Sequence, residues 1–238
     1  MLSSVRQRAL QGKGLSCEIR IVQDPDSLLH FELLDIQIPG AVAPVRICIA
    51  SWRGPVDPAR LIPFLGDPSE AGGLARRITH PRRLAESLLA RVAREELLHH
   101  GIPAGRGHFS LSHTSMDGRI VAAAGFSETP LGIDIESMQA LHGREDLISR
   151  ILTSEERDAL QLLPEDRRAL RPLELWCAKE SLGKALGTGL QAPLARFETQ
   201  RSLDPRVEAV VGFRHFPDWR AAIANDAGLI VAACVPKH

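Results

Sequence analysis

Residues 131–136 read LGIDIE and place two acids inside an apolar run. In a β-strand, residues two apart share a face, so Asp134 and Glu136 point the same way. Ile133 and Ile135 take the opposite face, which belongs to the core. A half-exposed strand with an acidic outer face explains this alternation. A second interpretation is a cation site, because two adjacent carboxylates repel each other and Mg²⁺ binds one or two carboxylates together with water and phosphate oxygens.

Residues 176–184 read WCAKESLGK, and on a helix their charges gather on one side. The polar side carries Lys179, Glu180 and Lys184, opposite an apolar stripe. Glu180 precedes Lys184 by four residues, the favoured order for an ion pair, so a solvated face is one interpretation. Gly183 argues against it, because glycine costs about 1 kcal/mol in a helix interior. A close approach to the helix backbone would justify that cost.

The stretch FSLSHTSMDG (109–118) predicts a strand that ends at a turn. Ser110, Ser112 and Thr114 share one side of this strand, and His113 lies on the other. A single histidine is usually a surface residue or a satisfied core residue. Beside a phosphate group, His113 would be a donor that carries charge near neutral pH, and Ser112 would add a hydroxyl donor.

The elements that position these residues are predicted from local signals. Asp117-Gly118 favours a hairpin between residues 109–113 and 119–126. Pro81 favours a helix start before residues 82–100, and Thr153 with Glu156 forms a capping box. Gly187 closes a helix over residues 173–186. Short apolar runs predict strands within residues 15–50 and again from about residue 195 to the end, whereas residues 51–81 are expected to be irregular.

Composition indicates a globular protein without a global charge bias. The 238 residues are 44% apolar and 24% charged, and the formal net charge is zero. We therefore expect neither nucleic-acid nor membrane binding. The four cysteines form no CxxC pair, and the N-terminus lacks the apolar core of a signal peptide, which favours the cytoplasm. The pattern predicts an α+β protein with two related units, residues 1–128 and 129–238.

In this order and spacing, the three stretches resemble motifs of the 4′-phosphopantetheinyl transferase family, in its two-lobed Sfp-like class. The family's serine-histidine strand is similar to residues 110–113, and its glycine–aliphatic–Asp–aliphatic–Glu strand is similar to residues 132–136. Its aromatic-x-x-Lys-Glu-Ser-x-x-Lys helix is similar to residues 176–184. The resemblance is strong over residues 74–190. Residues 105–107 read Gly-Arg-Gly, where the family often has Gly-Lys-Pro.

The resemblance implies a fold and a reaction. Two similar α/β lobes would form a pseudo-dimer with the active site in the cleft between them, complete within a monomer. The family moves phosphopantetheine from coenzyme A to a serine of an acyl or peptidyl carrier protein and releases adenosine 3′,5′-bisphosphate. A pyrophosphate phosphorus is attacked, so positioning and charge stabilisation dominate catalysis. The carrier is expected to dock between residues 141–146 and the helix over residues 153–160, with residues 137–152 touching it.

Site residues follow from the same resemblance. Asp134, Glu136 and Glu180 would hold Mg²⁺, and Glu180 is the candidate base for the carrier serine. Lys184 would contact the pyrophosphate, and Lys179 would orient Glu180 or touch a phosphate. Phosphate oxygens would be held from the opposite lobe by Ser112 and His113.

The resemblance also assigns the 3′-phosphate of coenzyme A to arginines upstream. Arg83 and Arg91, eight residues apart, are expected to share a helix face, with Arg82 and Arg76 as further candidates. Ordinary surface pairing with Glu86 and Glu95 is the competing interpretation. Three other functions stay open: a different Mg²⁺-dependent phosphotransferase, a non-catalytic module that binds coenzyme A or a carrier, and a structural protein.

Overall fold

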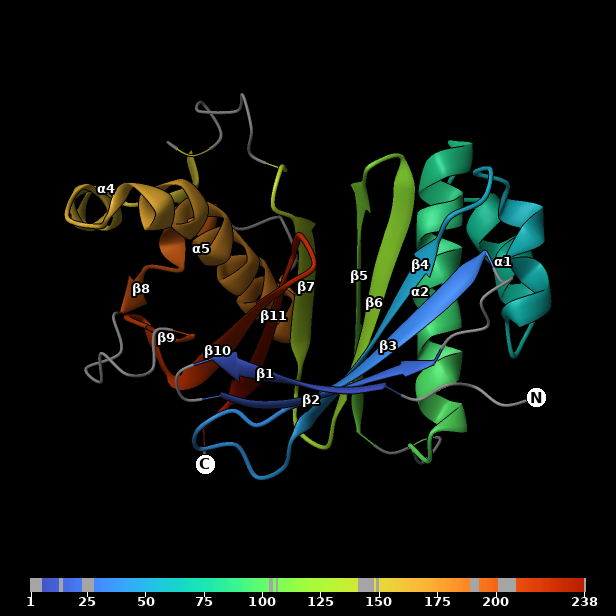
Figure 1. The fold of residues 1–238 in the computed structure, drawn as a ribbon, viewed down its shortest axis with the longest axis horizontal. Coiled ribbons are helices and arrows are strands. Elements are labelled where there is room, and N and C mark those ends of the chain that lie inside the picture. Colours follow the sequence, from blue (N-terminus) through green and yellow to red (C-terminus); the bar gives the residue numbers. More distant parts are fainter. Residues whose placement is uncertain are drawn as a thin grey trace.

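The structure is a computed structural model that describes residues 6–12, 15–22, 28–102, 105, 107–140, 148, 150–188, 193–200 and 209–237. It is an α+β protein with two antiparallel sheets (Figure 1). Among these residues, no helix is long and apolar enough to cross a membrane. The cysteines at positions 48, 177 and 234 are buried and free.

The first sheet has six strands in the order β1-β2-β3-β4-β6-β5. Its strands are β1 (Arg6–Gly12), β2 (Leu15–Val22), β3 (Leu29–Ile36), β4 (Val45–Trp52), β5 (His108–Met116) and β6 (Arg119–Ser127). Asp117 and Gly118 both have positive φ, which is what a two-residue β5–β6 hairpin turn requires. Helix α2 (Pro81–His99) packs on this sheet, with Pro81 in its first turn as predicted.

The second sheet has five strands in the order β7-β11-β10-β9-β8. They are β7 (Gly132–Ser137), β8 (Thr199–Gln200), β9 (Val210–Phe213), β10 (Phe216–Asp226) and β11 (Leu229–Pro236). Helix α5 (Glu165–Ala185) packs on its outer face, and α4 (Ser154–Gln161) precedes it. The predicted capping box of Thr153 and Glu156 at the start of α4 is confirmed.

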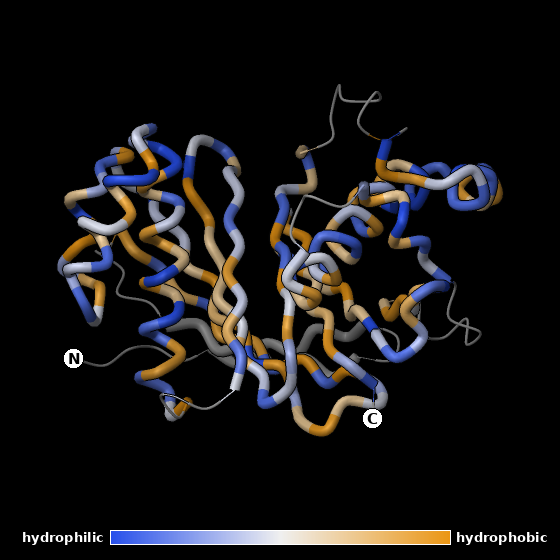
Figure 2. The backbone as a smooth tube through the Cα atoms, turned by 180° about the vertical axis from the view of Figure 1, so that it is seen from behind, coloured by the Kyte–Doolittle hydropathy of each residue, from blue (hydrophilic) through white to orange (hydrophobic). Residues whose placement is uncertain are grey.

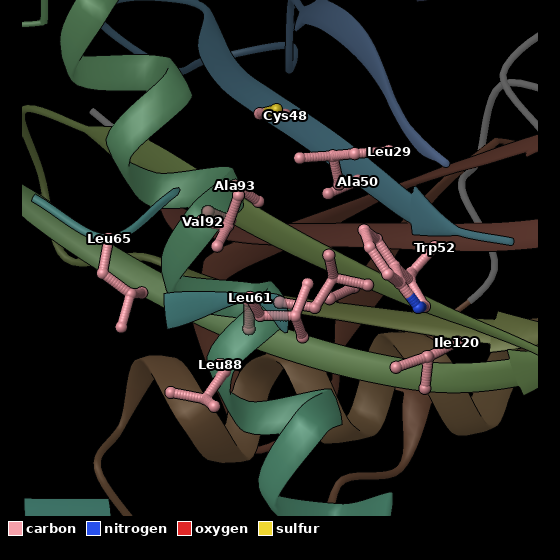
Figure 3. Packing of buried hydrophobic residues seen from close by; sticks show 14 of the residues in the cluster. Leu29, Cys48, Ala50, Trp52, Leu61, Leu65, Leu88, Val92, Ala93 and Ile120 are labelled. Atoms are coloured by element: carbon pink, nitrogen blue, oxygen red, sulfur yellow. The ribbon is translucent and has the colours of Figure 1, made fainter. Parts of the chain in front are cut away.

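The two sheets lie face to face between the two long helices (Figure 1). A shared core fills the space between them, with Ile47 and Val121 from the first sheet and Ile133 and Val231 from the second. A second core lies between α2 and the first sheet, where Trp52 also donates to the carbonyl of Pro55 at 3.0 Å (Figure 3). Accordingly, the hydrophobic segments concentrate along the central strands (Figure 2). Strands β5 and β7, the edges of their sheets, lie side by side (Figure 1).

Three expectations differ from the structure. The segment expected to be irregular contains η1 (Pro58–Arg60), η2 (Ile62–Phe64) and helix α1 (Ser69–Ala75). Helix α5 begins eight residues before the predicted start, at Glu165 rather than 173, and carries Pro172 inside it. Strand β1 falls where no strand was expected, and Arg106 lies outside the described residues.

Candidate functional site

Strands β5 and β7 are joined by side-chain hydroxyls instead of backbone pairing. Ser110 Oγ accepts a hydrogen bond from the Ile133 amide at 2.9 Å. Ser112 Oγ accepts from the amide of Ile135 at 3.3 Å, and Thr114 Oγ1 accepts from that of Ser137 at 3.4 Å. The three hydroxyls lie on the same side of β5, as the alternation predicted. We call residues 110, 112 and 114 the hydroxyl ladder.

The hydroxyl ladder holds Asp134 and Glu136 of β7 close to side chains of β5 and helix α5. Ser112 Oγ donates to Asp134 Oδ1 at 2.8 Å, and Thr114 Oγ1 donates to Glu136 Oε2 at 2.8 Å. From helix α5, Lys184 Nζ donates to Asp134 Oδ1 at 2.8 Å and to Ser112 Oγ at 2.8 Å. Asp134 is only 4% exposed, so the interpretation of β7 as a strand with a solvated acidic face is wrong.

Two carboxylates of this cluster, those of Glu136 and Glu180, have raised pKa values. Burial first, and then repulsion from Asp134, raise the pKa of Glu180 to about 7. The same two causes raise the pKa of Glu136 to about 7, against the opposing hydrogen bond from Thr114. Lys184 opposes the rise in both residues. The site therefore holds more buried negative charge than one lysine neutralises.

The donor set fits a hard cation in its chemistry. Asp134 Oδ2 and Glu180 Oε1 are buried and have no hydrogen-bond partner. An unpaired buried carboxylate oxygen is costly, and Mg²⁺ takes oxygen ligands of this kind. In the part of the chain that the structure describes, no three His, Cys, Asp or Glu side chains already form a metal-binding group. Lys184 Nζ is the cationic side-chain group that contacts Asp134.

His113 projects from the other side of β5 toward helix α2. Its Nδ1 lies 3.5 Å from Glu86 Oε2, while Ser115 Oγ donates to Glu86 Oε1 at 3.0 Å. Burial lowers the pKa of His113, and Glu86 is the strongest influence that raises it. Arg83 and Lys184 lie near enough to lower it further. Sequence reasoning considered Glu86 only as a partner for arginines, so its contact with His113 was missed.

The hydroxyl of Ser112 makes contacts within the protein. It is 6% exposed, its proton is given to Asp134, and its oxygen accepts from Lys184 and from the backbone of β7. A hydroxyl has one proton and two lone pairs, so these contacts use all of them. In this arrangement Ser112 supports Asp134 and Lys184, and its contact with phosphate oxygens stays a prediction.

The arginines of α2 separate into two groups. Arg91 pairs with Glu70 at 3.3 Å and also donates to the carbonyl of Ser87. Arg83 lies near His113 instead. A helix turns about 100° per residue, so eight residues leave an offset of about 80°, and the expected common face is wrong. Arg82 pairs with Glu86 at 3.4 Å, and Arg76 caps the C-terminus of α1.

Lys179 lies away from the cluster. Its side chain is completely buried, and Nζ donates to Glu156 Oε2 at 2.5 Å and to the Ile151 carbonyl at 2.8 Å. Glu156 also accepts from the backbone and the hydroxyl of Thr199. This placement connects α5 with α4 and β8, and it does not bear out the expectation that Lys179 touches a phosphate. The solvated-face interpretation of α5 is also wrong at this position.

A close approach between backbones occurs at Gly132 of β7. A Cβ at Gly132 would lie 1.8 Å from the Ser181 carbonyl oxygen and 2.6 Å from the Ala185 amide. Only a glycine allows α5 to lie this near to β7. That approach places Glu180 and Lys184 beside Asp134.

The family model for the 4′-phosphopantetheinyl transferase superfamily matches residues 130–234 of this chain. The match contains the acids of β7 together with Glu180 and Lys184 of α5. Through this segment, the chain is similar to the 4′-phosphopantetheinyl transferase superfamily. The family resemblance drawn from the three motifs is thereby confirmed.

Curated relatives match this chain over part of its length. The 4′-phosphopantetheinyl transferase Sfp of Bacillus subtilis (strain 168) is 31% identical over 127 residues, which are 53% of this chain and 54% of Sfp. A holo-[acyl-carrier-protein] synthase of Staphylococcus epidermidis (strain ATCC 12228 / FDA PCI 1200) is 44% identical over 59 residues, 24% of this chain and 50% of the synthase. The chain thus spans about half the length of these curated relatives.

One solved structure overlaps a smaller part of the fold. It is a holo-(acyl-carrier-protein) synthase from Bacillus anthracis str. Ames in complex with CoA (3′,5′-ADP). The alignment has 25% identity and a TM-score of 0.40, and it covers 46% of this chain and 96% of that one.

Proposed function

We propose that this protein transfers the 4′-phosphopantetheine group of coenzyme A to a serine of an apo acyl or peptidyl carrier protein, with Mg²⁺ as cofactor. Adenosine 3′,5′-bisphosphate is the leaving group. One observation carries the proposal: Asp134 and Glu180, each with an unpaired buried oxygen, lie in one cluster with Lys184 and the β5 hydroxyls. The names of the relatives support the reaction class.

The proposal divides the chain at the connection between β6 and β7. Residues 1–128 would form one lobe and residues 129–238 the other, with coenzyme A in a cleft between them. The position of β5 and β7 at the facing edges supports this division. All candidate groups come from one chain, so we propose a monomer, and we propose the cytoplasm as its location.

The charges of the cluster suit attack at a pyrophosphate phosphorus. Asp134, Glu136 and Glu180 would hold Mg²⁺, which when bound polarises phosphate oxygens as a Lewis acid. Lys184 neutralises negative charge on the leaving bisphosphate, because its ammonium group already lies in the cluster and is partly exposed. The pKa of Glu180, about 7, suits a base that removes the proton of the carrier serine near neutral pH.

The first lobe would hold phosphate groups of coenzyme A, including its 3′-phosphate. His113, held by Glu86, would donate to a phosphate oxygen. Arg83, close to His113, is the best-placed arginine for the 3′-phosphate, followed by Arg82. Arg91 is the weakest of the arginine candidates, since it pairs with Glu70.

The deciding experiment incubates the protein with coenzyme A, Mg²⁺ and a panel of apo carrier domains, and measures each carrier by intact mass spectrometry. A mass gain of one phosphopantetheine on the carrier serine is expected, and it should disappear in Glu180→Gln. Glu165→Gln is the matched control, because Glu165 lies exposed at the start of the same helix. Absence of transfer to every carrier would overturn the proposal. Hydrolysis of coenzyme A without a carrier would favour a different phosphotransfer enzyme.

A further inference from the structure

The hydroxyl ladder keeps a constant register along β5 and β7. Each of its three hydroxyls accepts from an amide exactly 23 positions further along the chain. All three ladder residues are no more than 9% exposed. The contacts therefore satisfy the outward amides of an edge strand that would otherwise lack partners.

The three hydroxyls of the ladder differ in the groups that accept their protons. Ser112 donates to Asp134, and Thr114 donates to Glu136, each at 2.8 Å. Ser110 makes the same kind of amide contact, but Gly132 stands opposite it and offers no side chain. Two hydroxyls of the ladder therefore contact a carboxylate, whereas the hydroxyl of Ser110 contacts the backbone of β7.

We propose that Thr114 and Ser112 are positioning residues that orient the carboxylates of Glu136 and Asp134 for a divalent cation. A hydroxyl that accepts from a fixed amide has its single proton directed away from that amide. The carboxylate oxygen that takes this proton is then held in place, and the second oxygen is free to serve as a ligand. At Asp134 that second oxygen is Oδ2, which is buried and has no hydrogen-bond partner.

The proposed cation site therefore depends on how β5 of the first sheet is aligned with β7 of the second. The hydroxyls belong to the first sheet, whereas both carboxylates belong to the second. Groups that orient metal ligands usually change metal affinity by 10- to 100-fold when they are removed. This inference rests on the cation site of the proposed function, and it concerns Mg²⁺ binding rather than transfer.

The test measures the Mg²⁺ concentration that gives half of the maximal rise in Tm, with MgCl₂ as the only added ligand. Binding to the folded state raises Tm by mass action. Thr114→Val keeps the branched shape and removes the hydroxyl, and it should raise this concentration roughly tenfold or more. Thr114→Ser restores the hydroxyl and should return it to within about threefold of the wild-type value. Ser110→Ala is the matched control, since it removes an equivalent amide contact without touching a carboxylate.

The outcomes separate this inference from the proposed function. An equal Mg²⁺ response in Thr114→Val and Ser110→Ala would overturn it, even if carriers are modified. A wild-type protein that Mg²⁺ does not stabilise would also overturn it. If Mg²⁺ binds with the expected pattern but no carrier is modified, the inference stands and the proposed function fails. Should Thr114→Val not fold, Thr114→Ala in the same titration is judged by the same criteria.

Discussion

Lys184 Nζ and Asp134 Oδ1 lie 2.8 Å apart and join helix α5 to strand β7. The same ammonium group donates to Ser112 of β5, so a single side chain connects both sheets and the helix. The side chain of Lys184 remains 26% exposed, which leaves it accessible to a ligand. Its charge therefore stabilises buried acids, and under the proposed function it would also contact an incoming phosphate.

Replacing Lys184 with Met should affect both stability and activity. Asp134 would lose its ionic partner, and we expect the free energy of unfolding to fall by about 1–3 kcal/mol. Carrier modification should fall by about 100-fold or more, the usual cost of removing one group that stabilises developing charge. Urea unfolding and the carrier assay measure the two effects. Lys184→Arg, which keeps the charge, should retain most of the stability; equal losses in both variants would contradict this account.

The two acids with a pKa of about 7 predict how stability depends on pH. Both values lie above the ordinary 4.5, so the folded state holds protons more tightly than the unfolded state. The free energy of unfolding should therefore decrease as pH rises from about 4.5 through about 7. Thermal unfolding without Mg²⁺ at pH 5.5 and pH 8 tests this. The double variant Glu136→Gln/Glu180→Gln should lack this contribution, and an unchanged pH dependence in it would contradict the prediction.

Under the proposed function, Mg²⁺ should oppose this trend. Protons compete with the metal for the same carboxylates, so a fixed Mg²⁺ concentration should raise Tm more at pH 8 than at pH 6. Differential scanning fluorimetry at both pH values measures it, with added Na⁺ of equal ionic strength as the control. A larger Mg²⁺ effect at pH 6 would count against Glu136 and Glu180 as ligands.

Replacing Lys179 with Ala should destabilise the protein without removing its chemistry. Glu156 would remain as a buried carboxylate without its ion-pair partner, a change that costs about 3–5 kcal/mol. Urea unfolding should show this loss. At low temperature, where the variant is folded, the transfer rate per folded molecule should stay within about tenfold of the wild type. A fully stable but inactive variant would instead assign Lys179 to the reaction.

Replacing Gly132 with Ala should move α5 away from β7. The new Cβ would overlap the Ser181 carbonyl oxygen, and overpacking against backbone should cost about 3 kcal/mol. Gly72→Ala is the control, since it lies in helix α1 with only the end of the Arg76 side chain nearby. That control should be neutral or should gain up to about 1 kcal/mol. Chemical denaturation distinguishes the two, and similar results for both would contradict the close approach.

Glu86→Gln should change the acidity of His113. Glu86 raises the pKa of His113, so removing its charge should lower that pKa. Arg83 and Lys184, which also lower it, and Asp134, which raises it, are unchanged by the substitution. An NMR titration of the imidazole signals measures the shift directly. Arg82→Gln, which changes the other partner of Glu86, is the comparison; an unaltered His113 pKa in Glu86→Gln would rule out the contact in solution.

Local signals in the sequence were sufficient for many elements. The Asp117-Gly118 turn, the proline in the first turn of α2 and the Thr153 capping box are each determined by a few adjacent residues. Period-two alternation also placed the three hydroxyls on one side of β5. Such signals involve residues that are close together in the sequence, so they can be recognised without knowing which elements pack against them.

Burial and long-range contacts could not be predicted from such local signals. Helix α5 shows one polar side in sequence, but Lys179 and Glu180 on that side are buried by α4, β7 and neighbouring segments. The partners in the site are far apart along the chain, 22 residues for Ser112 and Asp134 and 72 for Ser112 and Lys184. The motif resemblance brought these residues together, whereas the assignment of Ser112 as a support for other side chains required the structure.

The core shared by the two sheets has a consequence for how the chain folds. Ile47 and Val121 pack in the same cluster as Ile133 and Val231, so neither half buries its apolar face without the other. A polypeptide divided at residues 128–131 should give two fragments that are poorly soluble alone and regain structure when mixed. Substitutions in either half of the core are therefore constrained by the packing of the other half.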